Sequence, residues 1–249
     1  MRMTTPAQAL AFTTAGLFMT GLASADEGNR YNKERLYQAE ISAAQAYLEM
    51  EHSKGHDKSH KHQAKPVLID VRRLREYAAG HPEDAYNVPY PHKIENNDQT
   101  PFDLYSRVFE IVKGDLDTPI MLLCRTGSRS VDAGNILADP DSKTDTQGFE
   151  PFTDVRNIWE GFVGQYKYAY NGGDIQFDEN GDPIRLDLNN DGEVTTQDVA
   201  DVYQETADAN PDKDGWRNFQ GLPWTTSIRR PLAYENDVAQ YDAFMTPVD

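Results

Sequence analysis

The run Pro119-Ile120-Met121-Leu122-Leu123-Cys124-Arg125-Thr126-Gly127-Ser128-Arg129-Ser130 decides the fold of this chain. Its first part is apolar, as in a short strand that is buried on both faces of a parallel sheet. Its second part is small and cationic and begins with Cys124, the single cysteine among 249 residues. The run therefore predicts a buried strand that delivers one thiol to a loop.

The loop after Cys124 has the composition of an anion-binding site. Arg125 and Arg129 lie within five residues of the thiol, and guanidinium groups are rarely buried without anionic partners. Arginine charge, backbone N–H groups and a following helix N-terminus all favour the nucleophilic thiolate. The alternative is that Cys124 is a small buried hydrophobe, the usual fate of a lone cysteine. The two arginines favour a reactive cysteine.

Segments on both sides of this loop resemble the rhodanese family. Upstream, residues 67–72, 76–77, 80–81 and 87–90 read V-L-I-D-V-R, E-Y, G-H and N-V-P-Y, similar to the first strand of the family and the signature that follows it. Downstream, residues 155–162, 215–218 and 221–224 are similar to its last strand and closing segment. The resemblance covers about residues 38–228, apart from one insertion, and its several spaced motifs make it specific.

This resemblance implies an α/β, three-layer domain with a mainly parallel central sheet flanked by helices. Residues 67–71, 120–123 and 155–158 are expected among its strands. Parallel sheets of this kind place their sites at the carboxyl ends of the strands. We therefore expect the Cys124 loop at the carboxyl end of a central strand. Residues 41–50, within a run of helix formers from 32 to 50, resemble the first helix of the family.

The resemblance also implies a thiosulfate-type sulfurtransferase, in which a cysteine becomes a persulfide and passes the sulfur to a thiol-type acceptor or cyanide. Cys124 is then the nucleophile, and the substrate is bound by Arg125, Thr126, Gly127, Ser128 and Arg129. Backbone N–H groups of residues 126–129 are expected to point inward as an anion-binding nest, with Gly127 allowing the tight curl. Asp70, Arg72 and Glu76 are expected to support the loop. Arg129 either forks onto Asp70 or Glu76, or meets the substrate directly.

Two other functions stay open at this point. One is a persulfide carrier that hands sulfur to a partner without turnover of its own. The other is a phosphatase or arsenate-type enzyme, since phosphatases of the cell-cycle type are found on the same fold. Their pattern has five residues between cysteine and arginine, whereas four separate Cys124 from Arg129 here. The tighter loop favours a single sulfur atom over a tetrahedral phosphate, although a shared fold does not settle function.

A second motif, residues 187–198, resembles an EF-hand calcium loop. The ligand positions one, three, five, seven, nine and twelve are occupied by Asp187, Asn189, Asp191, Glu193, Thr195 and Asp198. Gly192 stands at the sharp turn, and Asp198 replaces the longer glutamate of many EF-hands, as in dockerins. The alternative is an Asp/Asn turn followed by a helix N-cap at Thr195. We expect one structural calcium ion and no organic cofactor.

Three further polar segments carry weaker signals. Asn210, Asp212, Asp214, Gly215 and Asn218 echo the calcium loop but have Gly221 at the twelfth position. Residues 178–183 predict a turn. His52, His56, His60 and His62 have the density of a metal-binding stretch, but the Gly, Ser and Lys around them favour a solvated loop.

These observations give a domain plan. Residues 1–25 read as a signal peptide that ends in the A-S-A motif of residues 23–25, which favours secretion to a bacterial periplasm over a membrane anchor. Residues 26–64 form an N-terminal helix and the His-rich loop. Residues 65–228 form the rhodanese-like domain, interrupted at about 165–213 by the insertion with the calcium loop, and 229–249 form a C-terminal tail.

Charge and cysteine content limit the partners. The formal net charge is −17, and loss of the signal peptide, with Arg2 and no acidic residue, makes it one unit more negative. Such a surface repels nucleic acid and anionic membranes. We expect a small sulfur-containing anion as donor and no membrane insertion after signal removal. Because a lone cysteine forms no intrachain disulfide, a thiol or protein outside the chain has to discharge the persulfide.

Overall fold

The computed structural model describes residues 33–54, 65–90, 93–94, 97–171, 174–188, 190, 192 and 213–233. Its helices are α1 (Ala43–Lys54), α2 (Leu74–Ala78), α3 (Pro101–Ile111) and α4 (Arg129–Ala138), with 3-10 turns at Pro140–Ser142, Thr144–Thr146 and Arg230–Leu232. Its strands are β1 (Ala39–Ile41), β2 (Val67–Asp70), β3 (His81–Pro82), β4 (Tyr86–Asn87), β5 (Lys93–Ile94), β6 (Asn97–Asp98), β7 (Ile120–Leu123), β8 (Val155–Ile158), β9 (Tyr170–Asn171), β10 (Asp174–Ile175) and β11 (Trp224–Thr225).

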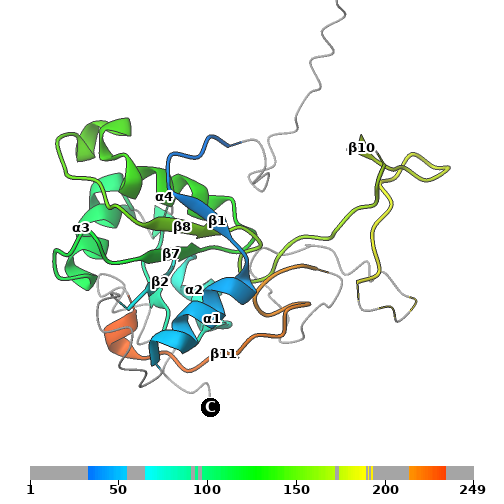
Figure 1. Ribbon diagram of the computed structural model, residues 1–249, viewed down its shortest axis with the longest axis horizontal. Coiled ribbons are helices and arrows are strands. Elements are labelled where there is room, and N and C mark those ends of the chain that lie inside the picture. The colour runs from blue at the N-terminus through cyan, green and yellow to red at the C-terminus, as the bar shows by residue number, and fades with distance from the viewer. Residues whose placement is uncertain are drawn as a thin grey trace, which may run out of the picture.

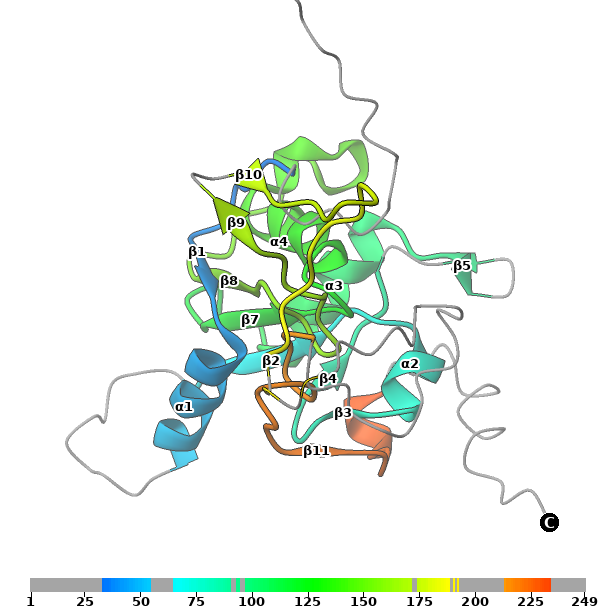
Figure 2. The same ribbon diagram turned by 90° about the vertical axis from the view of Figure 1, so that its right-hand side faces the viewer.

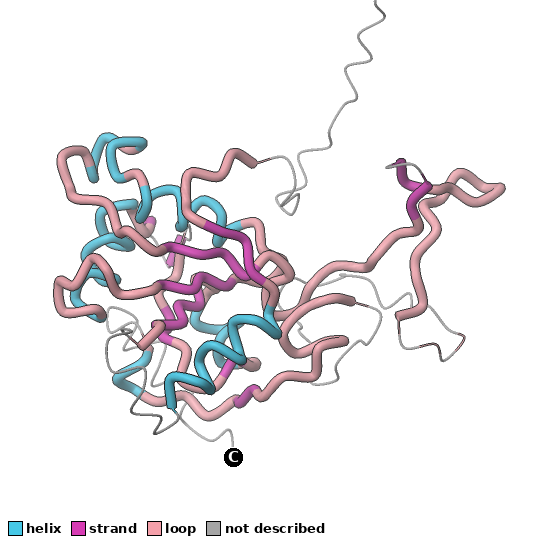
Figure 3. Tube along the Cα trace, viewed as in Figure 1, coloured by secondary structure: helices cyan, strands magenta, loops and turns pink. Residues whose placement is uncertain are grey.

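Five strands form the central sheet in the order β1-β8-β7-β2-β4, and each neighbouring pair in it is parallel. The apolar strand that precedes Cys124 is β7, which lies in the middle of this order and is buried along its whole length. Figure 3 shows the strands as a layer between helices. The expected α/β class with a parallel central sheet is confirmed, as are the expected strands.

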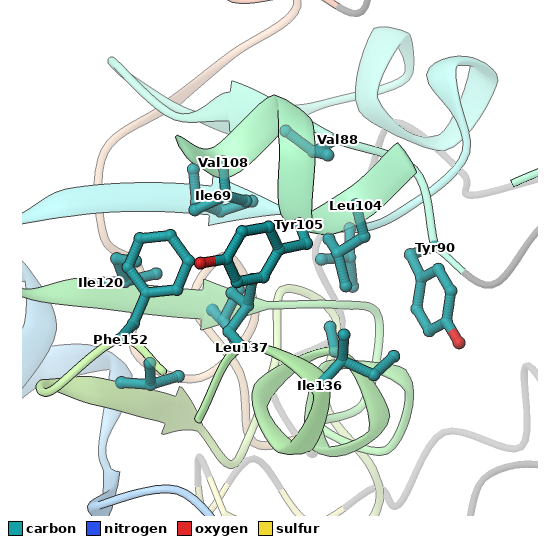
Figure 4. Close-up of a cluster of buried hydrophobic side chains, with 14 of the residues drawn as sticks. Ile69, Val88, Tyr90, Leu104, Tyr105, Val108, Ile120, Ile136, Leu137 and Phe152 are labelled. Atoms are coloured by element: carbon teal, nitrogen blue, oxygen red, sulfur yellow. The ribbon is translucent and has the colours of Figure 1, made fainter. Parts of the chain in front are cut away.

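Alternation along the strands divides the core into two layers. Ile120 and Leu122 of β7 pack on the side of α3 and α4, whose buried side chains include Leu104, Tyr105 and Ile136 (Figure 4). Met121 and Leu123 pack on the opposite side, with α1 and α2. Figure 2 shows α3 and α4 together, away from α1 across the strands. Helices thus cover both faces, as a parallel sheet requires.

The helix expected over residues 41–50 is confirmed as α1, but the helix formers before it, from residue 32, do not extend that helix. Residues 39–41 form β1, which pairs with β8, and the helix begins only at Ala43. Ile41 is buried in the core when residues 39–41 pair with the sheet edge. This pairing and burial outweigh the helix propensity of the stretch. The Ser42 hydroxyl then accepts a hydrogen bond from Gln45 N (3.0 Å) and caps the helix.

After β8 the chain leaves the domain in a long excursion that carries β9 and β10 and projects from the sheet (Figure 1). The predicted turn over residues 178–183 is confirmed, because Gly181 N and Asp182 N bond to the carbonyl and carboxylate of Asp178. The described chain resumes at Lys213, which forms a bridge with Tyr166. Among the described residues, no helix has the length and apolar character needed to cross a membrane.

Candidate active site

Cys124 lies at the carboxyl end of β7, and the loop that it opens leads directly into α4 at Arg129. The thiol is fully buried, and its sulfur accepts hydrogen bonds from Gly127 N (3.1 Å) and the Ser130 hydroxyl (3.4 Å). Two donors and the positive end of a helix therefore surround this sulfur. Such a setting stabilises negative charge on sulfur and makes a cysteine nucleophilic.

Gly127 makes the tight loop possible. Its φ is +85°, a region that side chains oppose, and a Cβ on it would lie 1.9 Å from the carbonyl oxygen of Trp159. The loop thus packs directly on the backbone that follows β8. No residue other than glycine fits at this position without moving one of the two segments.

Arg129 lies against Glu76 from α2. Its two terminal nitrogens donate to the two carboxylate oxygens, Nη1 to Oε2 at 2.9 Å and Nη2 to Oε1 at 2.6 Å. Burial alone would raise the pKa of Glu76, but the hydrogen bonds and charge of Arg129 outweigh it and hold that pKa at about 2. Of the alternatives open in the sequence, this geometry shows the fork onto Glu76, which braces the loop against α2.

Asp70 does not pair with Arg129. Its carboxylate forms an ion pair with Arg72 instead, with 2.7 Å between Asp70 Oδ2 and Arg72 Nη2, and both side chains are fully buried. Arg72 also donates to the carbonyl of Gly80. The ring of Phe162 covers the Arg72 guanidinium at 4.2 Å. Asp70 and Arg72 therefore fix the segment that carries α2, and with it Glu76, so their contact with the loop is indirect.

The remaining members of the predicted loop lie as follows. Arg125 and Thr126 are half-buried and Ser128 is buried. The carbonyl of Cys124 accepts from Phe162 N, and that of Arg125 accepts from Val163 N and Gly164 N, at 2.8 to 3.1 Å. The segment after β8 thus supports the loop from outside.

Four groups near the loop were missed in the sequence: Lys33, Asn157, Glu160 and the segment 213–218. Asn157 and Lys33 donate to loop carbonyls. The buried Glu160 accepts from Ala43 N at 2.8 Å and holds the start of α1. Residues Trp216 and Arg217 bond through their backbone N–H groups to Gly161 and Phe162. Lys33 had no signal, whereas Asn157 and Glu160 lie in the matched segment 155–162 and residues 215–218 match the closing segment.

The predicted metal residues fall mostly outside the described part of the chain. Asn189, Asp191, Glu193, Thr195 and Asp198 of the calcium loop lie there, as do Asn210, Asp212, His56, His60 and His62. Gly192 N donates to Asp187 Oδ2 at 2.8 Å, and Gly192 has a φ of +91°. The buried Asp214 accepts from Gln165 N and pairs with Lys167 at 2.8 Å. Within the described ranges, no three His, Cys, Asp or Glu residues form a metal-binding group.

Fold and loop together define an α/β domain with a cysteine loop at the end of its central strand. Residues 54–167 match the family model described as the rhodanese-like domain. Residues 1–53 and 168–249 lie outside that match.

Two individual proteins are similar to parts of the chain. A presumed mitochondrial thiosulfate sulfurtransferase of Schizosaccharomyces pombe is 35% identical over 71 residues, which are 28% of this chain. The chain spans about half of that relative, 49% of its length. A solved rhodanese with anions from E. coli shares 22% identity over 38% of this chain and 85% of its own, with a TM-score of 0.27.

Proposed function

We propose that the protein is a sulfurtransferase that uses Cys124 as its nucleophile. The Cys124 thiolate attacks the outer sulfur of thiosulfate or a related sulfane donor, the sulfur–sulfur bond of the donor breaks, and sulfite leaves with the electron pair. The terminal sulfur of the resulting persulfide is then attacked by a thiol or cyanide, which gives an acceptor persulfide or thiocyanate and restores the thiolate. A covalent intermediate of this kind splits one difficult transfer into two easier steps.

The observation that carries this proposal is the environment of the sulfur. Gly127 N and the Ser130 hydroxyl donate to Cys124 Sγ, and the start of α4 lies beside it. Arg129 forks onto Glu76, which braces the loop against α2. The spacing of four residues between Cys124 and Arg129 supports binding of a single sulfur atom rather than a tetrahedral phosphate. The family match over residues 54–167 and the name of the relative support the same chemistry.

The test is persulfide formation on the intact protein. Incubation with thiosulfate is expected to add one sulfur atom by intact mass spectrometry, and cyanide is expected to remove it as thiocyanate. Cys124→Ser is the control and is expected to gain nothing. An adduct without turnover to cyanide or small thiols would show a carrier instead. Hydrolysis of an aryl phosphate by the same sample, without any adduct, would show a phosphatase and refute the proposal.

We also propose that the protein works in a bacterial periplasm and carries a structural calcium ion. The first rests on the signal-like residues 1–25 and the second on the spacing of oxygen side chains over 187–198. The hydrogen bond from Gly192 N to Asp187 and the positive φ of Gly192 support a loop that curls as position six of a calcium loop requires. Calcium there would offset the repulsion of dense carboxylates.

A further inference from the structure

Four carbonyl groups of the Cys124 loop accept hydrogen bonds from outside the loop. The backbone after β8 supplies the donors for Cys124 and Arg125. Side chains supply the other two: Asn157 Nδ2 donates to the carbonyl of Gly127 at 3.3 Å, and Lys33 Nζ donates to that of Ser128 at 3.2 Å. The last two contacts come from parts of the chain far from the loop in sequence.

The direction of a carbonyl fixes the direction of the next N–H group. In a trans peptide the C=O and the following N–H lie in one plane and point in opposite directions. Asn157 draws the carbonyl of Gly127 outward, so the N–H of Ser128 turns inward. The carbonyl of Ser128 accepts from Lys33 Nζ and from Val131 N (3.2 Å) in the first turn of α4, so these two contacts together turn the N–H of Arg129 inward in the same way. Successive inward N–H groups form an anion-binding nest.

The orientation of the Asn157 side chain is fixed by burial and by a second hydrogen bond. Asn157 is 1% exposed, and its Nδ2 also donates to Glu40 Oε2 at 2.9 Å. The other oxygen of Glu40 accepts from Tyr37 Oη and Arg35 Nε, both at 2.5 Å. The reversed amide orientation would point Asn157 Oδ1 at two acceptors, the Glu40 carboxylate and the Gly127 carbonyl, so only the orientation with Nδ2 toward the loop is favourable.

Lys33 is held by a second contact on α4. Its Nζ pairs with Asp132 Oδ2 at 2.5 Å, while the same nitrogen reaches the Ser128 carbonyl. Nearby, Leu36 N donates a hydrogen bond to Asn135 Oδ1 at 2.8 Å. The segment before β1 is therefore attached to α4 at two places, which fixes the position of the lysine next to the loop.

We propose that Asn157 and Lys33 are positioning residues that orient the Ser128 and Arg129 N–H groups toward a bound sulfur oxyanion. This inference rests on the proposed function for the identity of the anion. Neither side chain donates to the carbonyl of Thr126, whose peptide carries the N–H of Gly127 that reaches Cys124 Sγ. Loss of either residue therefore weakens anion binding, while the hydrogen bond from Gly127 N to Cys124 Sγ is not addressed by either side chain.

The test is protection of Cys124 from alkylation in the full chain. Iodoacetamide is added at a series of inorganic sulfate concentrations, with sulfate as an unreactive dianion, and the modified fraction is read by intact mass. The variants Asn157→Ala and Lys33→Met, tested separately, are each expected to need roughly tenfold more sulfate for half protection. This factor corresponds to the weakest effects seen when a hydrogen bond to a charged group is lost. The alkylation rate without sulfate is measured for each variant and serves as its own reference, and Lys33→Arg is expected to restore protection.

Asn87→Ala is the matched control for Asn157→Ala. Asn87 is also 1% exposed, and its Nδ2 donates to the carbonyls of Asp70 and Arg72, away from the loop. Lys54→Met, which loses ion pairs with Glu51 and Asp84, is the control for Lys33→Met. Three results would overturn the proposal. Sulfate protection could be unchanged in Asn157→Ala and Lys33→Met, it could be equally weakened in the controls, or it could be absent from the wild type. Because sulfate protection needs no sulfur transfer, failure of the proposed reaction would leave this result readable.

Discussion

The pair of Glu76 and Arg129 predicts a stability difference that depends on pH. The pKa of Glu76 falls from an ordinary 4.5 to about 2, because Arg129 more than offsets the effect of burial. Each factor of ten in proton affinity corresponds to about 1.4 kcal/mol, so the ionised carboxylate contributes about 3 kcal/mol to the free energy of unfolding. Glu76 and Arg129 are mostly buried, with side chains 2% and 20% exposed, so solvent screens this contribution little.

The sign follows from the depressed pKa. A carboxylate with a lowered folded-state pKa stabilises the fold above its unfolded pKa, and this stabilisation is lost as the pH falls through the folded value. Glu76→Gln removes the charge and keeps the shape. We expect the variant to be less stable than the wild type by about 3 kcal/mol at neutral pH. The gap is expected to close between pH 4.5 and about 2, where the wild-type carboxyl becomes protonated.

The assay is urea unfolding of both proteins, followed by circular dichroism at several pH values. Glu110→Gln is the control, since Glu110 is 67% exposed and pairs with Arg107 on the surface of α3. An exposed pair of this kind contributes less than about 1 kcal/mol. A gap between wild type and Glu76→Gln that is the same at neutral and acid pH would refute the reasoning, because it would assign the loss to packing alone.

The remaining predictions concern the loop and the insertion. Gly127→Ala is expected to cost about 2 kcal/mol or more in urea unfolding, because a Cβ there meets the Trp159 carbonyl at a φ of +85°; wild-type stability would contradict this. Arg125→Gln is expected to raise the KM for thiosulfate roughly tenfold with little change in kcat, as for a lost charged contact; a fall in kcat alone would exclude substrate binding by Arg125. Calcium is expected to raise the Tm and EGTA to reverse the rise, and Asp187→Ala is expected to abolish both effects; a Tm that ignores calcium would refute the metal site.

Local patterns in the sequence predicted those parts of the fold whose signals are local. The apolar run before Cys124 gave the central strand, and the small residues after it gave the tight loop. Even the bracing role of Glu76 could be anticipated, because Arg129 needed a carboxylate and Glu76 stood in the matching motif. The sequence did not show whether Arg129 pairs with Glu76 or with Asp70. Asp70 pairs with Arg72, which also bonds to the carbonyl of Gly80, and this arrangement forms only in the folded chain.

Contacts between distant segments could not be predicted in this way. Glu40 and Asn157 are 117 residues apart and meet only because β1 joins the edge of the sheet next to β8. The composition of residues 32–50 favoured a helix there, so the strand and its link to the loop were missed together. Lys33 was missed for the same reason, as its contact with Ser128 spans 95 residues.

The base of the insertion explains how a long excursion can coexist with a tightly built loop. Gln165 N donates to Asp214 Oδ1 at 2.7 Å, and Asp214 N donates back to Gln165 O at 3.1 Å, so the chain leaves and returns at bonded residues. Gly164 allows this closeness, because a Cβ on it would lie 1.1 Å from the carbonyl oxygen of Asp214. The entropy of closing a loop grows only slowly with its length. The bonded base therefore closes the long excursion, and Gly164 N next to it donates a hydrogen bond to the carbonyl of Arg125, which links this base directly to the Cys124 loop.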